Sequence, residues 1–276
     1  MIRFLKLTNF ELNRFFKIYL SLIGITFVMQ ILAVVIASRN YMNEVKEQLA
    51  NGNTMEYVLN NSGMFSLNNV TRGMLFTAPV ALCIVTLLIY VFFIWYRDWL
   101  GKNTFAYRLL MLPISRIKVY FAKATAIFLM VLGLVSLQIV FLLIQKEIMV
   151  QMVPDVFRID QNLHEIIFGF DYMRVIFPLS FMEFLIHYGI GFMAVLVVFT
   201  AILLERSFRW KGILLGLAYV GAAVLVFISP VLLQISILEE FFYPTELFIL
   251  TVITGLVVTA GSIWMSHYLL NKKIRV

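Results

Sequence analysis

Few residues of this chain have the types and the spacing that catalysis or metal binding requires. His164 and Glu165 begin the pattern H-E-x-x-H, in which two histidines one helical turn apart hold zinc, but Phe168 occupies the position of the second histidine. Gly101-Lys102 looks like the end of a phosphate-binding loop, but Asn103 follows in place of Ser or Thr, and no glycine stands five residues earlier. We therefore expect no metal, no cofactor and no catalytic activity in this chain.

Two further pairs of ionisable residues lie close together in the sequence. Glu239 and Glu240 look like the paired glutamates of membrane proteases, but F-F-Y-P follows where an arginine is expected. Glu183 and His187 are four residues apart inside an apolar segment, so they share one face of a helix. An ionisable pair inside a membrane predicts a substrate path or an outer gate. The alternative is a pair at headgroup level that is solvated or hydrogen-bonded.

The composition of the chain indicates its class of protein, because apolar residues are in large excess. The 276 residues are 62% hydrophobic and their mean hydropathy is +0.94, whereas soluble domains are about 45–50% apolar. The chain is therefore predicted to be an integral membrane protein. Its net charge of +7 does not indicate nucleic-acid binding, because the basic residues flank apolar spans, where they determine membrane topology.

Six segments have the roughly 20 mostly apolar residues that a membrane helix needs: 18–37, 73–96, 124–144, 176–204, 213–233 and 245–267. We predict an all-α integral membrane protein whose residues 1–276 form a single transmembrane domain. Two polar external segments, 38–72 and 145–175, are each too small for a core of their own. Gln138, in mid-span, is predicted to bond a neighbouring helix rather than a substrate.

Two prolines are predicted to break the fourth and fifth of these segments. Pro178 should separate a short outer helix from the fourth crossing, because proline ends or kinks a helix. Ser229-Pro230 should interrupt the fifth segment, and the residues after it would form a short outer helix or a re-entrant segment.

Positive charge determines the predicted orientation, because Lys and Arg accumulate on cytoplasmic loops. Sixteen of the 22 basic residues lie in four segments that six spans place on one side: the N-terminus, 97–123, 206–211 and the C-terminal tail. Both termini are therefore predicted to be cytoplasmic. Residues 1–17 combine apolar and basic residues at helical spacing, which predicts an amphipathic interfacial helix. An aromatic belt on the cytoplasmic side is predicted from the four tryptophans, Trp95, Trp99, Trp210 and Trp264.

The loop between the second and third spans, Tyr96 to Lys123, carries six basic residues and one acid, Asp98. It includes a candidate for a short helix that Thr104 can cap and Pro113 ends. Three apolar residues fall on one face of that helix, namely Phe105, Leu109 and Leu112. A short helix in a tight cytoplasmic loop is typical of a membrane protein that a cytoplasmic partner pushes.

In its layout the chain resembles the membrane subunit of bacterial ABC transporters of the type-2 export class. The resemblance rests on the interfacial helix before six spans, the broken outer end of the fifth, the short loop after the fourth and, above all, the second–third loop. In that loop Asp98, the threonine-led helix, L-P-I-S-R at 112–116 and Lys123 match the family's pattern. The resemblance implies a coupling helix near 104–112 that docks into a separate ATP-binding subunit. Its implied docking residues are Thr104, Phe105, Arg108, Leu109, Leu112 and Arg116.

The resemblance also implies partners and a location. Such a permease works with two copies of an ABC ATPase subunit, which hold ATP and Mg, and with a second membrane subunit that is identical or paralogous. It is a multi-pass protein of the bacterial plasma membrane lipid bilayer, and it exports a substrate that the sequence does not define. Two alternatives stay open here: a non-transporting structural, sensory or immunity subunit, and an ATP-independent transporter. The lack of a broken ion-coordinating helix or a chain of buried acids disfavours the transporter.

Overall fold

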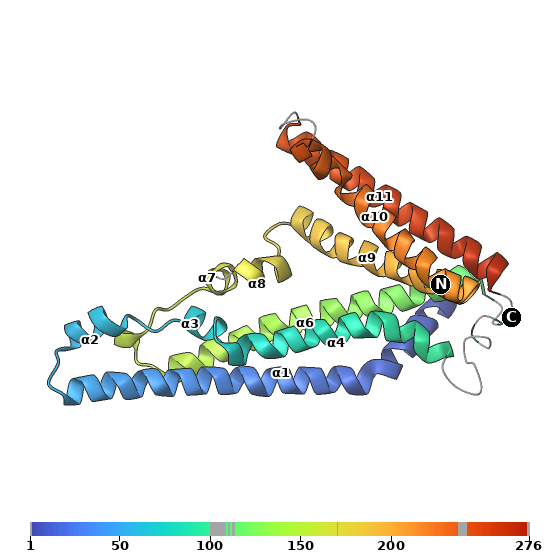
Figure 1. The fold of residues 1–276 in the computed structure, drawn as a ribbon. Coiled ribbons are helices and arrows are strands. Elements are labelled where there is room, and N and C mark those ends of the chain that lie inside the picture. Colours follow the sequence, from blue (N-terminus) through green and yellow to red (C-terminus); the bar gives the residue numbers. More distant parts are fainter. Residues whose placement is uncertain are drawn as a thin grey trace. The chain divides into compact units, whose positions relative to one another are not determined.

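The computed structural model describes residues 2–99, 109, 111, 114–169, 171–236 and 242–274. Within these residues six helices are long and apolar enough to cross a membrane, as predicted (Figure 1). They are α1 (Ile2–Ala50), α4 (Met74–Trp99), α6 (Arg116–Met152), α9 (Phe181–Phe208), α10 (Trp210–Ser236) and α11 (Pro244–Tyr268). The shorter helical elements are α2 (Met55–Ser62), α3 (Leu67–Thr71), η1 (Asp155–Phe157), α7 (Leu163–Phe168), α8 (Asp171–Ile176) and the π-helical turn η2 (Leu269–Lys273).

Helix α1 is much longer than the span predicted at 18–37. It includes residues 2–17, which are helical as predicted, and it continues to Ala50 through residues that were expected to begin the first external segment. Residues 38–50 contain neither glycine nor proline, and several are strong helix formers. The helix ends just before Gly52, whose φ of 84° is a left-handed conformation that favours glycine. The interfacial position of residues 1–17 stays a prediction.

The two prolines behave differently. Pro178 lies between α8 and α9, so a short helix precedes the fourth span as predicted. The predicted interruption at Pro230 is wrong, because α10 continues through it to Ser236. Pro230 has no N–H for the Val226 carbonyl, but the Ser229 hydroxyl donates to that oxygen at 2.8 Å and replaces the missing bond. Residues 237–241, where the outer helix or re-entrant segment was expected to continue, lie outside the described residues.

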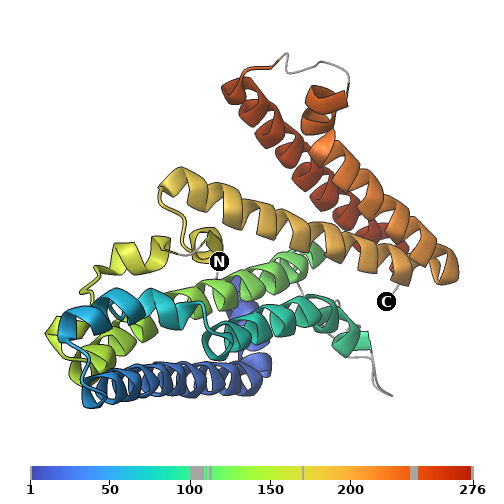
Figure 2. The ribbon, with the colours of Figure 1, turned by 60° about the vertical axis from the view of Figure 1, so that its left-hand side comes forward.

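The chain divides into two compact units. The first consists of Met1–Asn13, Leu88–Phe128 and Leu185–Val276, and the second of Arg14–Leu87 and Leu129–Phe184. In the second unit, α1, α4 and α6 run side by side (Figures 1 and 2). In the first unit, α10 and α11 do the same.

The two segments that were predicted to be external share one hydrophobic core in the second unit. Its buried members include Val58, Phe65 and Leu67 from the first segment and Phe157, Ile166 and Met173 from the second, packed with residues of α1 and α6. Backbone bonds join the segments, because the Phe65 N–H donates to Phe157 O at 2.8 Å and the Ile159 N–H donates to Phe65 O at 2.9 Å. Each segment is too small for its own core, and pairing them solves that problem.

A buried layer of amides joins α1 to α6 in the same unit. Gln30 and Gln138 exchange two hydrogen bonds of 3.1 Å, and Gln145 Nε2 donates to Gln30 Oε1 at 2.9 Å. This confirms that Gln138 bonds a neighbouring helix. Amides bonded to one another in this way hold apolar helices together. Gln145 Oε1 is buried without a hydrogen-bond partner.

In the first unit, α9 and α10 form a tight hairpin. A single residue, Arg209, joins the two helices, and its φ of 53° turns the chain. Gly212, in the first turn of α10, lies so close to α9 that a Cβ there would stand 2.6 Å from Glu205 Cα. A glycine is needed because any side chain at this position would push the two helices apart.

Candidate functional site

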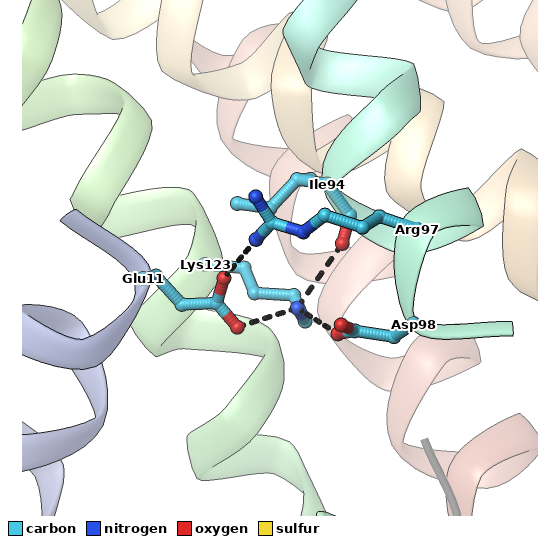
Figure 3. A network of polar contacts seen from close by, with 5 residues as sticks. All are labelled: Glu11, Ile94, Arg97, Asp98 and Lys123. Atoms are coloured by element: carbon cyan, nitrogen blue, oxygen red, sulfur yellow. Dashed lines mark hydrogen bonds and ion pairs between the residues drawn. The ribbon is translucent and has the colours of Figure 1, made fainter. Parts of the chain in front are cut away.

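A buried lysine on α6, Lys123, is the centre of an ionic network in the first unit (Figure 3). Its Nζ lies 2.6 Å from Glu11 Oε1, 2.5 Å from Asp98 Oδ2 and 3.2 Å from the carbonyl oxygen of Ile94. These three acceptors use all three N–H groups of an ammonium. Glu11 also accepts from Arg97, since Arg97 Nη2 lies 2.9 Å from Glu11 Oε2. The network therefore balances two acids against two bases.

The positions of these side chains in their helices explain how the network forms. Glu11 lies near the start of α1, Arg97 and Asp98 occupy the last turn of α4, and Lys123 is two turns into α6. The network thus joins three helices. It also holds together the end of α4 and the start of α6, between which the predicted coupling helix lies in the sequence.

Burial indicates that the network has a structural role and is not a reactive centre. The Lys123 side chain is 0% exposed and those of Glu11 and Asp98 are 3% and 1% exposed. An ammonium with three acceptors has no capacity left to abstract a proton from a substrate. Removing one partner would strand a buried charge, at a cost of about 3–5 kcal/mol. The arrangement is suited to holding three helices in register.

One aromatic ring covers the ammonium, and two others pack against that ring. Lys123 Nζ lies 5.3 Å from the centre of the Trp95 ring, within range of a cation–π interaction. Trp95 stacks on Trp99 with ring centres 5.2 Å apart and packs edge-on against Phe199 at 5.6 Å. The prediction that Trp95 belongs to an aromatic belt at the membrane surface is wrong. Its side chain is only 2% exposed and packs over the buried ionic network. Trp210 and Trp264 are exposed, and their place at the membrane interface stays a prediction.

Hydroxyl groups extend the contacts of α6 to two more helices. The Tyr120 hydroxyl donates to Leu196 O on α9 at 2.9 Å. On α9, Thr200 Oγ1 lies 2.9 Å from Ser266 Oγ of α11. All of these side chains except that of Leu196 are polar and fully buried, and each has a partner. The helices around Lys123 are therefore tied to the C-terminal spans of the first unit.

Most of the predicted docking segment falls on residues that the structure does not describe. Thr104, Phe105, Arg108 and Leu112 lie outside the described residues, and their docking role stays a prediction. Leu109 is described and is 5% exposed.

Arg116 is described fully and has contacts within the chain. Its Nη1 donates to Leu270 O at 2.6 Å and to Ile274 O at 2.9 Å. These carbonyls belong to the turn η2 and to the residue after it, so Arg116 caps the C-terminal end of the last helix. The interactions give Arg116 a structural task that the sequence did not indicate.

Glu183 and His187, the predicted gate pair, lie near the beginning of α9. Glu183 Oε2 accepts the N–H of Leu179 at 2.8 Å, and the Glu183 N–H donates to Ser180 Oγ at 3.1 Å. These bonds satisfy N–H groups that the start of a helix leaves unpaired, and they match the hydrogen-bonded alternative. His187 is exposed. A role for the pair in a substrate path stays a prediction.

Glu11 is the residue of this network that sequence reasoning missed. It is the only acid among the first 43 residues, and it lies between basic side chains in a segment predicted to be amphipathic. A lone carboxylate in such a segment was the available signal. Among the described residues, no group of three or more His, Cys, Asp or Glu side chains is placed to hold a metal ion.

Comparison of the chain with protein-family models, with curated proteins and with solved structures found no match.

Proposed function

We propose that this chain is the permease subunit of an ATP-driven exporter of the ABC type-2 class, whose ATPase is a separate chain. The observation that carries the proposal is the buried network around Lys123. It connects α1, α4 and α6 at the two ends of the segment 100–115, which we call the basic loop. A displacement of this loop would therefore move three membrane helices together. A loop that only connects two spans has no need of such an attachment.

The six apolar helices and the distribution of positive charge agree with this function. An ATPase pair that closes on ATP would push the loop 100–113 from the cytoplasmic side. The rigid attachment at Glu11, Asp98 and Lys123 would transmit that push into the spans. No nucleotide chemistry is required of this chain, because its partner supplies ATP hydrolysis.

Co-purification tests the proposal directly. Tagged protein would be isolated from its native cell in mild detergent, and the co-eluting chains identified. We expect a soluble ATPase to co-elute with the wild type and to be lost with Phe105→Asp or Arg108→Glu. Lys118→Glu is the matched control, because Lys118 is an exposed cation near the start of α6 and is outside the implied docking set.

The result that would contradict the proposal is a folded wild-type protein that brings down no ATPase. The non-transporting subunit and the ATP-independent transporter would then be the better interpretations. If the ATPase co-elutes, its hydrolysis rate in reconstituted vesicles should respond to the substrate, whereas a purely structural subunit would leave that rate unchanged.

A further inference from the structure

A small hollow lies where α9 turns into α10. Five residues line it, namely Glu205, Arg206, Arg209, Trp210 and Ile213, and its volume is about 420 Å³. All five residues belong to the first unit. We call this feature the arginine hollow.

The two arginines of the hollow are held in different ways. The Arg206 guanidinium lies over the Tyr96 ring at 5.0 Å and over the Trp99 ring at 5.1 Å. Stacking uses the face of the guanidinium, and its N–H groups, which lie in the plane, can still donate to an oxygen. Arg209 is the residue that turns the chain between the two helices.

The charge of the hollow is not balanced by the described part of the chain, in which no ion pair joins Arg206 or Arg209 to a carboxylate. The one acid in the lining, Glu205, accepts a hydrogen bond from the Tyr96 hydroxyl. Two guanidiniums and one carboxylate leave one positive charge. A ligand with a single negative charge and some hydroxyl groups would balance the hollow and satisfy Glu205.

The surroundings of the hollow decide which anion fits. Both α9 and α10 are long enough to cross a membrane, and the hollow lies at the ends of both. Trp210 beside it is 86% exposed, and Leu214 on the next part of α10 is 73% exposed. An apolar surface that is exposed on a membrane-spanning helix is covered by lipid. In a bilayer the hollow would therefore adjoin acyl chains on one side, while its arginines carry positive charge on the other.

We propose that the arginine hollow binds the headgroup of an anionic glycerophospholipid such as phosphatidylglycerol. The phosphodiester would accept from the guanidiniums of Arg206 and Arg209, and a glycerol hydroxyl would donate to Glu205. The acyl chains would run along the exposed apolar face of α10. Basic groups at the end of a membrane helix attract anionic lipids in this manner. The inference requires a membrane but not the proposed transport function.

Lipid retention measured by native mass spectrometry tests the site. The full chain would be equilibrated in nanodiscs of phosphatidylglycerol and phosphatidylcholine in equal amounts and then released from the membrane. We expect the wild type to retain phosphatidylglycerol, and the variant R206Q/R209N to lose roughly 10- to 30-fold of this preference, since each basic residue contributes on the order of five-fold. Asparagine is chosen at position 209 because it tolerates positive φ.

The control variant is Lys211→Gln, which removes one neighbouring cation that does not line the hollow. It should retain phosphatidylglycerol as the wild type does. Circular dichroism and gel filtration would establish that each variant is folded. Equal retention of the two lipids by the wild type, or an unchanged preference in R206Q/R209N, would overturn the proposal.

Two further measurements separate the lipid from other anionic partners. If millimolar inorganic phosphate displaces phosphatidylglycerol, the hollow recognises a soluble anion and the lipid assignment is wrong. If R206Q/R209N keeps its lipid preference but no longer co-purifies with a protein that the wild type captures, the hollow is a protein-docking surface. Phosphatidylethanolamine retained as strongly as phosphatidylglycerol would show that net charge is not what the hollow selects.

Discussion

Lys123 Nζ lies 2.5 Å from Asp98 Oδ2, and the two side chains are 0% and 1% exposed. This ion pair joins the end of α4 to the start of α6, on either side of the basic loop. Buried ion pairs often contribute little net stability, since desolvation offsets their attraction. Their retention is better explained by what they position, and here that is the base of the loop.

Replacing Lys123 by methionine is expected to destabilise the protein strongly. The change leaves Glu11 and Asp98 without the ammonium that both contact, and a stranded buried charge costs about 3–5 kcal/mol. Denaturant unfolding in detergent, followed by circular dichroism, measures the loss.

A double-mutant cycle with Asp98→Asn separates the ion pair from the effect of burial. The double variant should be more stable than the sum of the single losses predicts, by about 0.5–3 kcal/mol, because it removes both charges. Lys118→Met, at an exposed position on the same helix, should change stability by less than about 0.5 kcal/mol. Equal effects at positions 118 and 123 would refute the role assigned to the network.

Asp98 and Lys123 stand out in the sequence, but the sequence does not predict that they form an ion pair. Both belong to the pattern of the basic loop, yet 25 residues separate them, and Glu11 is 112 residues from Lys123. Apolar length predicts the spans because the bilayer sets it. Side-chain partners across helices depend on packing, which periodicity does not define. The amphipathic pattern that predicted the helix at 1–17 did not indicate which residues would pair with its single acid, Glu11.

Helix ends were harder to predict than helix cores for a related reason. The bilayer sets a minimum length, but α1 and α6 continue well past it because their sequences favour helix and because the segments predicted to be external pack on them. Trp95 was assigned to the lipid interface from its position in the sequence. Only the structure shows that it covers a buried cation instead.

Arg116 is expected to hold the C-terminal end of the last helix. Arg116→Gln should remove the bonds to Leu270 and Ile274, each worth about 1.5–3 kcal/mol as a charged hydrogen bond. Hydrogen exchange should therefore become faster in η2 while exchange in α1 stays unchanged. Lys118→Gln provides the matched control. Unchanged exchange in η2 would show that these bonds contribute nothing to its order.

Acid should weaken the connection that follows α6. Arg158 donates from Nε to Asp160 at 2.8 Å, and this bond lowers the pKa of the Asp160 carboxyl below its usual value of 3.8. A lowered pKa means that the contribution to stability is present above pH 3.8 and is lost as the pH falls through the pKa of the folded protein. Below pH 4, the drop in Tm on thermal unfolding should therefore be slightly larger for the wild type than for Asp160→Asn. Identical profiles would contradict this.

Ser229 is expected to be required only because Pro230 follows it. Ser229→Ala should leave the Val226 carbonyl without its hydroxyl donor, and a carbonyl left unpaired away from water, as in a membrane-spanning helix, costs about 1–3 kcal/mol. In the background Pro230→Ala, the new backbone N–H can bond Val226, so the same Ser229→Ala change should cost almost nothing. Unfolding curves of the four proteins give the comparison. If Ser229→Ala is equally damaging with and without the proline, the hydroxyl does not replace the missing N–H in α10.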